Sequence, residues 1–266
     1  MAVSAKEVQA LRQLTGAGMM DAKRALEANN GDAEAAALWL RERGLGKAAE
    51  RSGRENAEGA IALARQDNVA ALVHLRCETD FVAKSPDFVN LANDIAQGVV
   101  EKGEAAAAGF QPAIDDLKIT LKENVELGEV VRIEAPAGHV LDTYLHVQNG
   151  RGVNGILIEL DGGSQELAHD IALTAAFSRP SVVSVDEVDP DAIANERAQL
   201  EKETIADGKP EAALEKIVAG KLTGWHKRQP GGVLLEQPFA KEPKQSVGQQ
   251  LGDVKIANFS QLLIES

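Results

Sequence analysis

The side chains with catalytic potential are one cysteine and five histidines, and their spacing forms no known reactive pair or metal set. His74 lies three residues before Cys77 in a strand-like segment, so the two side chains should point to opposite faces. No histidine has the neighbours of a zinc protease or a zinc finger. Gly16 and Gly18 precede a helix but also follow one, which is typical of a helix–helix turn and not of a phosphate loop. We therefore predict no catalytic residue, no metal site and no cofactor.

Charge and composition exclude several other function classes. The net charge is −13 and aromatic residues make up 3% of the chain, so both the basic surface and the stacking platforms of a nucleic-acid binder are lacking. A single cysteine cannot form an intramolecular disulfide, which fits a reducing compartment. The first residues lack an apolar signal segment, and no apolar run approaches the roughly 18 residues that span a bilayer. We expect a cytoplasmic protein that binds neither membranes nor nucleic acid directly.

The pattern of elements predicts an α+β fold built from four parts. Helix caps and apolar spacing predict three short helices at the N-terminus, followed by a Gly-, Lys- and Arg-rich linker over 45–56. Two hairpin-then-helix patterns follow, which suggests a core of two related halves with antiparallel sheets. The N-terminal three-helix bundle is predicted over 1–52 and the first half of the core over 53–138. The second half of the core is predicted over 139–186 and 229–266, and an antiparallel helical hairpin over 187–228 protrudes from it.

Two short segments carry residues that a simple core would not need. Met19 and Met20 are adjacent at a helix start, so both cannot face one core, and at least one should form a soft contact surface. The alternative is that both fill a small bundle. Phe81 follows Asp80 at a strand-to-helix corner, which can point Phe81 outward while Phe88 packs inside. The alternative is that Phe81 is a core residue.

Together these segments resemble the translation elongation factor Ts family. The resemblance rests on T-G-A-G-M-M-D at residues 15–21 and T-D-F-V-A at residues 79–83, and it extends from residue 4 to about 250. It implies a ubiquitin-associated-like N-terminal bundle, and it implies a non-enzymatic exchange factor whose partner is the GTPase elongation factor Tu. By this resemblance the residues that bind the partner are Arg12, Met19, Met20, Thr79, Asp80, Phe81, Val82 and His146.

The resemblance also assigns roles to these residues. Arg12 and the two methionines would dock on the partner's nucleotide domain. Asp80 and Phe81 would approach its magnesium site, with Phe81 as a wedge between helices. His146 would contact another domain from a strand on which Asp142, Tyr144 and His146 alternate onto one exposed polar face.

Two other functions remain open from the residues alone. A non-catalytic adaptor or dimerising scaffold would bind its target without changing nucleotide exchange, and the helical hairpin could dimerise, hold a partner or brace the core. An enzyme that uses Cys77 or the histidines is the other alternative, and thiol alkylation would inactivate it.

Overall fold

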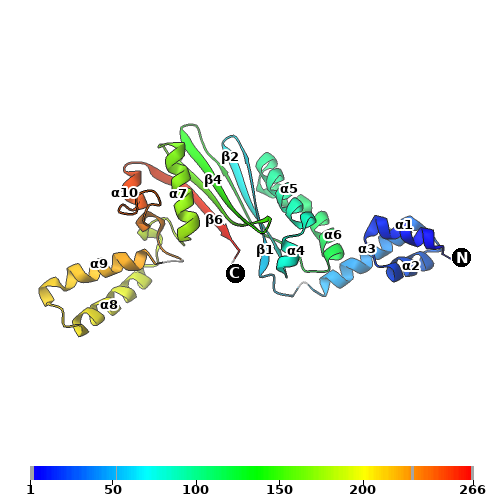
Figure 1. The fold of residues 1–266 in the computed structure, drawn as a ribbon, viewed down its shortest axis with the longest axis horizontal. Helices are drawn as coiled ribbons and strands as arrows, with labels where there is room; N and C mark the ends of the chain where they lie inside the picture. The colour runs from blue at the N-terminus through cyan, green and yellow to red at the C-terminus, as the bar shows by residue number, and fades with distance from the viewer. Residues whose placement is uncertain (1–2, 52, 229–230, 265–266) are drawn as a thin grey trace.

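The computed structural model describes residues 3–51, 53–228 and 231–264, and its elements form an elongated molecule with the sheets in the middle (Figure 1). The N-terminal helices lie at one end and the helical hairpin at the other. Predicted boundaries at residues 1–2, 52, 229–230 and 265–266 lie outside the described residues. The helices are α1 (Ala5–Thr15), α2 (Met19–Ala28), α3 (Ala33–Ala49), α4 (Asp80–Ala83), α5 (Pro86–Lys102), α6 (Gln111–Leu121), α7 (Gln165–Ser178), α8 (Pro190–Ala206), α9 (Leu214–His226) and α10 (Val247–Leu251).

The strands and short 3-10 helices complete the chain. The strands are β1 (Glu58–Gln66), β2 (Val69–Cys77), β3 (Glu126–Glu134), β4 (His139–Gln148), β5 (Arg151–Asp161) and β6 (Lys255–Leu263). The 3-10 helices are η1 (Glu104–Phe110), η2 (Val185–Glu187), η3 (Glu211–Ala213) and η4 (Leu234–Glu236). Sheet A has the order β1-β2-β3 and sheet B the order β4-β5-β6, and every pairing is antiparallel. The predicted α+β class is confirmed.

The N-terminal helices α1 and α3 begin at N-cap residues that are recognisable in the sequence. Ser4 and Glu7 form a capping box before α1, and the Asp32 side chain accepts the N–H groups of Glu34 and Ala35 before α3. Leu11 and Leu26 are fully or almost fully buried between the helices. The three helices thus share one small core.

The expected linker over 45–56 is partly helix, because α3 continues to Ala49 and packs against α6. Gly44 allows this contact: a Cβ at Gly44 would lie 2.8 Å from Cγ2 of Ile119. Just beyond the helix, the Arg51 guanidinium donates to the Lys118 carbonyl at 2.9 Å. These contacts supply the stabilisation that glycine-rich sequence lacks on its own.

The two sheets pack face to face, and helices cover their outer faces. On β1, Ala60 and Ala62 face the cluster beneath α5, whereas Ile61 lies in the cluster between the sheets. On β5, Ile158 faces α7 and Leu157 faces sheet A. The order of layers is therefore helices, sheet A, sheet B, helix α7, as Figure 1 shows.

A glycine brings the two sheets unusually close. A Cβ on Gly152 would lie 2.2 Å from the Ile61 carbonyl oxygen, far inside van der Waals contact. Beside it, the buried guanidinium of Arg151 donates to the Gly59 carbonyl at 2.6 Å and to Glu58 Oε2 at 2.7 Å. The start of β5 is therefore fixed to the start of β1.

The helical hairpin α8–α9 leaves the core and returns to it at neighbouring points. Leu200 and Val218 are its buried apolar residues, one on each helix. At its base the Ser181 N–H donates to the Gly232 carbonyl at 2.9 Å, and the Gly231 N–H donates to the Arg179 carbonyl at 2.9 Å. The core side of the hairpin is thus closed by backbone hydrogen bonds.

Candidate interaction surfaces

The corner between β2 and α5 presents an aromatic side chain to solvent. Helix α4 is one turn long, and Thr79 is its N-cap residue, with its side-chain oxygen accepting the Val82 N–H at 3.4 Å. Ala83 is buried beneath the turn, whereas Phe81 is 83% exposed. The turn therefore holds Phe81 away from the protein.

Phe81 and Phe88 have opposite environments although they are close in sequence. Phe88 is fully buried in the cluster between sheet A and α5. It lies in the first turn of α5, which begins at Pro86 after the N-cap residue Ser85. The interpretation of Phe81 as a core residue is therefore wrong, and its aromatic ring is free to contact another molecule.

A charged residue accompanies the exposed ring. Asp80 is paired with Lys84 one turn later, and this hydrogen bond is the main cause that holds the pKa of Asp80 below its usual range. Asp80 is therefore ionised at neutral pH. The corner combines a large apolar ring with a neighbouring ion pair.

A third residue of this corner comes from a distant part of the chain. Glu123 follows α6, and its Oε2 accepts the N–H groups of Glu78 and Thr79 at 3.1 and 3.0 Å. Its Oε1 accepts the Thr79 hydroxyl at 2.5 Å. Sequence reasoning missed Glu123, because 44 residues separate it from Thr79 and no local pattern marks the contact.

The N-terminal bundle also exposes apolar side chains. Leu14 at the end of α1 is 73% exposed, and Met19 and Met20 at the start of α2 are 60% and 62% exposed. Arg12 is exposed on α1. The interpretation that both methionines fill the bundle core is wrong. The turn between the helices contains Gly16 with φ of 67°, a left-handed conformation that ends α1.

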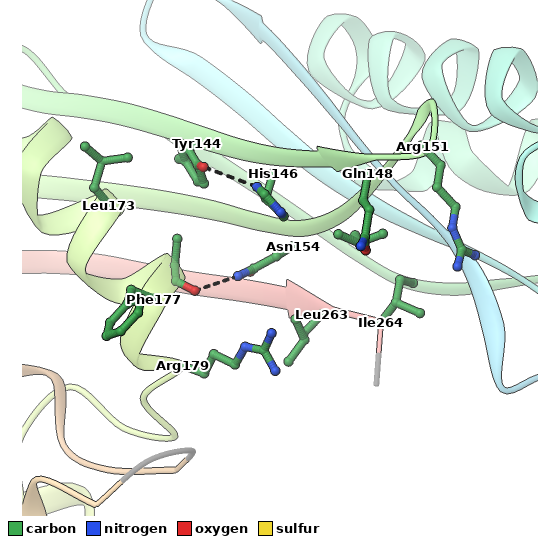
Figure 2. Close-up of a pocket in the computed structure, with 12 residues that line it drawn as sticks. Tyr144, His146, Gln148, Arg151, Asn154, Leu173, Phe177, Arg179, Leu263 and Ile264 are labelled. Atoms are coloured by element: carbon green, nitrogen blue, oxygen red, sulfur yellow. Dashed lines mark hydrogen bonds between the residues drawn. The ribbon is translucent and has the colours of Figure 1, made fainter. Parts of the chain in front are cut away.

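The second half of the core carries a hollow of about 610 Å³ between α7 and sheet B, shown in Figure 2. His146 is exposed, and its Nδ1 lies 3.5 Å from the Tyr144 hydroxyl. Phe177 from α7 is 83% exposed at the edge of the hollow, and Arg179 lies just beyond the helix. Sequence reasoning missed Phe177. The available signal was its position on α7, because a large apolar residue outside the buried stripe of a helix must face solvent.

Asp142 does not share the exposed face expected for it with Tyr144 and His146. Asp142 is 7% exposed, and its carboxylate contacts the side chains of Gln165 at 2.7 Å and His169 at 2.9 Å. Helix α7 covers this part of β4 and supplies both partners, so the expected polar face is limited to the far end of the strand.

Cys77 and His74, the two side chains considered as a nucleophile pair, both have pKa values shifted by burial. Burial, with the nearby Glu123 carboxylate, raises the pKa of the Cys77 thiol to about 12. Burial, with the charge of Arg76, lowers the pKa of His74 to about 4. A protonated thiol and a neutral imidazole do not form an activated nucleophile pair. Among the described residues no three His, Cys, Asp or Glu side chains gather as a metal site would require.

Within the part of the chain that the structure describes, every helix is too short or too polar to cross a membrane.

Comparison with known proteins gives one consistent result. A family model described as Elongation factor TS matches residues 78–264. Relatives named Elongation factor Ts cover nearly the whole chain. They include proteins of Pseudarthrobacter chlorophenolicus (39% identical over 265 residues, 95% of this chain and 94% of the relative), Renibacterium salmoninarum (40% over 260 residues, 93% and 92%) and Alkalilimnicola ehrlichii (37% over 273 residues, 97% and 91%).

Proposed function

Because the chain belongs to the elongation factor Ts family, the guanine-nucleotide exchange factors of elongation factor Tu, we propose that it releases GDP by inserting Phe81 near the magnesium and phosphate site of that GTPase. Family membership also confirms the resemblance that the two sequence motifs carried. The observation that carries the proposed mechanism is the 83% exposure of Phe81 on a capped, one-turn helix. An apolar ring of this size gains most by entering a pocket on another protein.

The exchange reaction requires contacts that differ between the nucleotide-bound and the empty GTPase. By reciprocity, the protein weakens nucleotide binding by the same factor by which nucleotide weakens its own binding. An acceleration of several orders of magnitude needs several kcal/mol at about 1.4 kcal/mol per tenfold. A single aromatic contact contributes about 2–4 kcal/mol by truncation. Phe81 must therefore act together with other surfaces.

Two further surfaces supply this support in the proposal. Arg12, Met19 and Met20 dock the N-terminal bundle on the nucleotide domain, with the flexible methionine side chains adapting to its surface. His146 in the hollow of the second core half contacts another domain. Both surfaces hold the partner while Phe81 enters. The binding free energy of these contacts then offsets the cost of opening the nucleotide site.

Asp80 contributes charge at the same place. Its carboxylate is ionised and lies one residue before Phe81. Near a bound magnesium ion, this carboxylate attracts the ion and so competes with the nucleotide phosphates for it. Thr79 and Val82 belong to the same proposed partner-binding surface, and the hydrogen bond from the Val82 N–H to the Thr79 side chain maintains the turn that presents Asp80 and Phe81.

The test is stopped-flow release of a fluorescent GDP from purified elongation factor Tu, with and without this protein. The proposal requires release rates that rise with the concentration of the protein and fall sharply with Phe81→Ala. A complex on gel filtration without any acceleration would instead identify an adaptor. Acceleration that Phe81→Ala leaves unchanged would keep the exchange function and reject the wedge.

A further inference from the structure

Glu123 connects the exchange corner to the rest of the molecule. Building on the exchange function proposed above, we propose that Glu123 is a positioning residue, which holds the turn of α4 so that Phe81 points along the direction of insertion. In this proposal Glu123 does not contact the partner, and its hydrogen bonds go to Glu78 and Thr79. It acts through the backbone of residues 78 and 79.

The hydrogen bonds of Glu123 determine which group of the Thr79 side chain donates and which accepts. The Thr79 hydroxyl has one proton, and it donates this proton to Glu123 Oε1 at 2.5 Å. Its lone pairs are then left to accept the Val82 N–H, which closes the first turn of α4. The other carboxylate oxygen accepts two backbone N–H groups, those of Glu78 and Thr79. One carboxylate therefore orders the backbone before the turn and the cap within it.

Helix α4 needs this external support. It has four residues, and a single turn is not stable by itself in water because helix nucleation is unfavourable. Ala83 is the buried residue of the turn and Val82 packs, partly buried, against the same cluster, so the apolar anchor of the turn is small. Phe81 is 83% exposed, so its ring has little packing against the protein that could fix its direction. The direction of the ring is thus set by the backbone that Glu123 holds.

The same segment also joins the corner to the N-terminal bundle. Glu123 follows Lys122, which has φ of 61° and ends α6. Helix α6 packs against α3 through Ile119 and through an ion pair between Arg41 and Asp116 at 3.2 Å. The N-terminal bundle and the Phe81 corner are therefore both attached to α6. Glu123, which follows α6, makes the hydrogen bonds that attach the corner.

Glu123→Gln tests this role with little change of shape, because it removes the charge and one of the two acceptor oxygens. A matched control is Glu104→Gln, since Glu104 Oε1 also accepts a backbone N–H, that of Arg132 at 3.1 Å, in the same half of the core. Glu123→Gln should lower the maximal rate of GDP release from elongation factor Tu about tenfold, as expected for the loss of charge-assisted hydrogen bonds. Glu104→Gln should leave the rate unchanged.

A double-mutant cycle separates positioning from general stability. If Glu123 acts through Phe81, then Glu123→Gln added to Phe81→Ala should lower the rate less than about twofold. An equal tenfold reduction in both backgrounds would overturn the proposal, because the effect would not pass through the ring. If the wild-type chain itself fails to accelerate release, the exchange function is refuted, and the following measurement still decides whether Glu123 holds the corner.

The single cysteine reports on the corner without any partner. Cys77 is fully buried, and its thiol donates to the Thr79 carbonyl at 3.3 Å. Labelling by a maleimide should be about tenfold faster in both Glu123→Gln and Glu123→Asp than in the wild type or in Glu104→Gln, at a temperature well below unfolding. Because Glu123→Asp keeps the negative charge that helps to raise the Cys77 pKa, faster labelling in that variant reports opening of the corner and not a lower thiol pKa. Unchanged labelling would show that Glu123 does not hold the corner. If Glu123→Gln does not fold, Glu123→Asp, which withdraws the carboxylate by one methylene, must give the same two results.

Discussion

Phe81 and Phe88 offer a matched pair of substitutions that separates function from folding. The two residues have the same side chain and lie seven positions apart, but Phe81 is 83% exposed and Phe88 is fully buried. Phe81→Ala should change the free energy of unfolding by less than about 0.5 kcal/mol, as for exposed positions. Phe88→Ala should destabilise the protein by about 3–5 kcal/mol, because it opens a cavity beneath α5.

The expected effect of Phe81→Ala on exchange follows from its exposed area. Full burial of a Phe side chain is worth up to about 3 kcal/mol, and the exposed fraction of 83% leaves about 2.5 kcal/mol for the partner. At about 1.4 kcal/mol per tenfold, this corresponds to a roughly 60-fold slower maximal GDP release. Complex formation with GDP-bound elongation factor Tu should weaken by a smaller factor, because a wedge gains its contacts as the nucleotide site opens.

Three measurements on the same samples decide the matter: denaturant unfolding, stopped-flow GDP release at saturating exchange factor, and the dissociation constant of the complex. Equal losses of binding and of maximal release rate for Phe81→Ala would refute the wedge and make Phe81 a plain anchor. A large loss of folding stability for Phe81→Ala would contradict the exposed position of the ring. Phe88→Ala with full stability would contradict the core described here.

Three further predictions concern buried polar groups. Because burial raises the pKa of Cys77 to about 12, alkylation at pH 7.5 should be much slower in the native protein than in urea and should leave exchange intact; rapid labelling with loss of activity would instead favour an enzyme. His74 has a pKa of about 4 when folded and about 6.5 when unfolded, so its contribution to stability is complete above pH 6.5 and is lost as the pH falls towards 4. His74→Gln should therefore flatten this part of the pH dependence of the urea midpoint, and an unchanged slope would contradict the shift. Arg151→Met removes the donors to the Gly59 carbonyl and to Glu58, and it should cost about 2–3 kcal/mol in denaturant unfolding, whereas an unchanged midpoint would show that this contact does not hold the two sheets together.

Local sequence signals were sufficient for the ends of many elements. Helix α5 begins at Pro86 after the N-cap residue Ser85, and the Asp32 side chain caps α3; such signals can be found in the sequence because a cap requires only neighbouring residues. The strand pairs also followed from short-range alternation. The turn between β4 and β5 consists of Asn149 and Gly150, both with positive φ, which fits a tight hairpin.

The parts that the sequence did not reveal depend on contacts between distant residues. Glu123 reaches Thr79 across 44 positions. The end of α3 is stabilised by Ile119 on α6, so residues that resemble a linker are helical. Asp142 lies on the strand face that was expected to be exposed together with Tyr144 and His146, yet α7 covers it. In each case a helix packs against a segment whose local pattern carries no information about that helix.

The closed base of the α8–α9 hairpin has a consequence for how this part of the molecule can change during evolution. The backbone hydrogen bonds between Ser181 and Gly232 and between Gly231 and Arg179 bring the entry and exit of the hairpin together. Insertions or deletions beyond that junction therefore alter the length of the arm without displacing the strands of sheet B. The hairpin is thus a separable module, because its junction with the core is fixed by backbone hydrogen bonds that do not depend on the length of the arm.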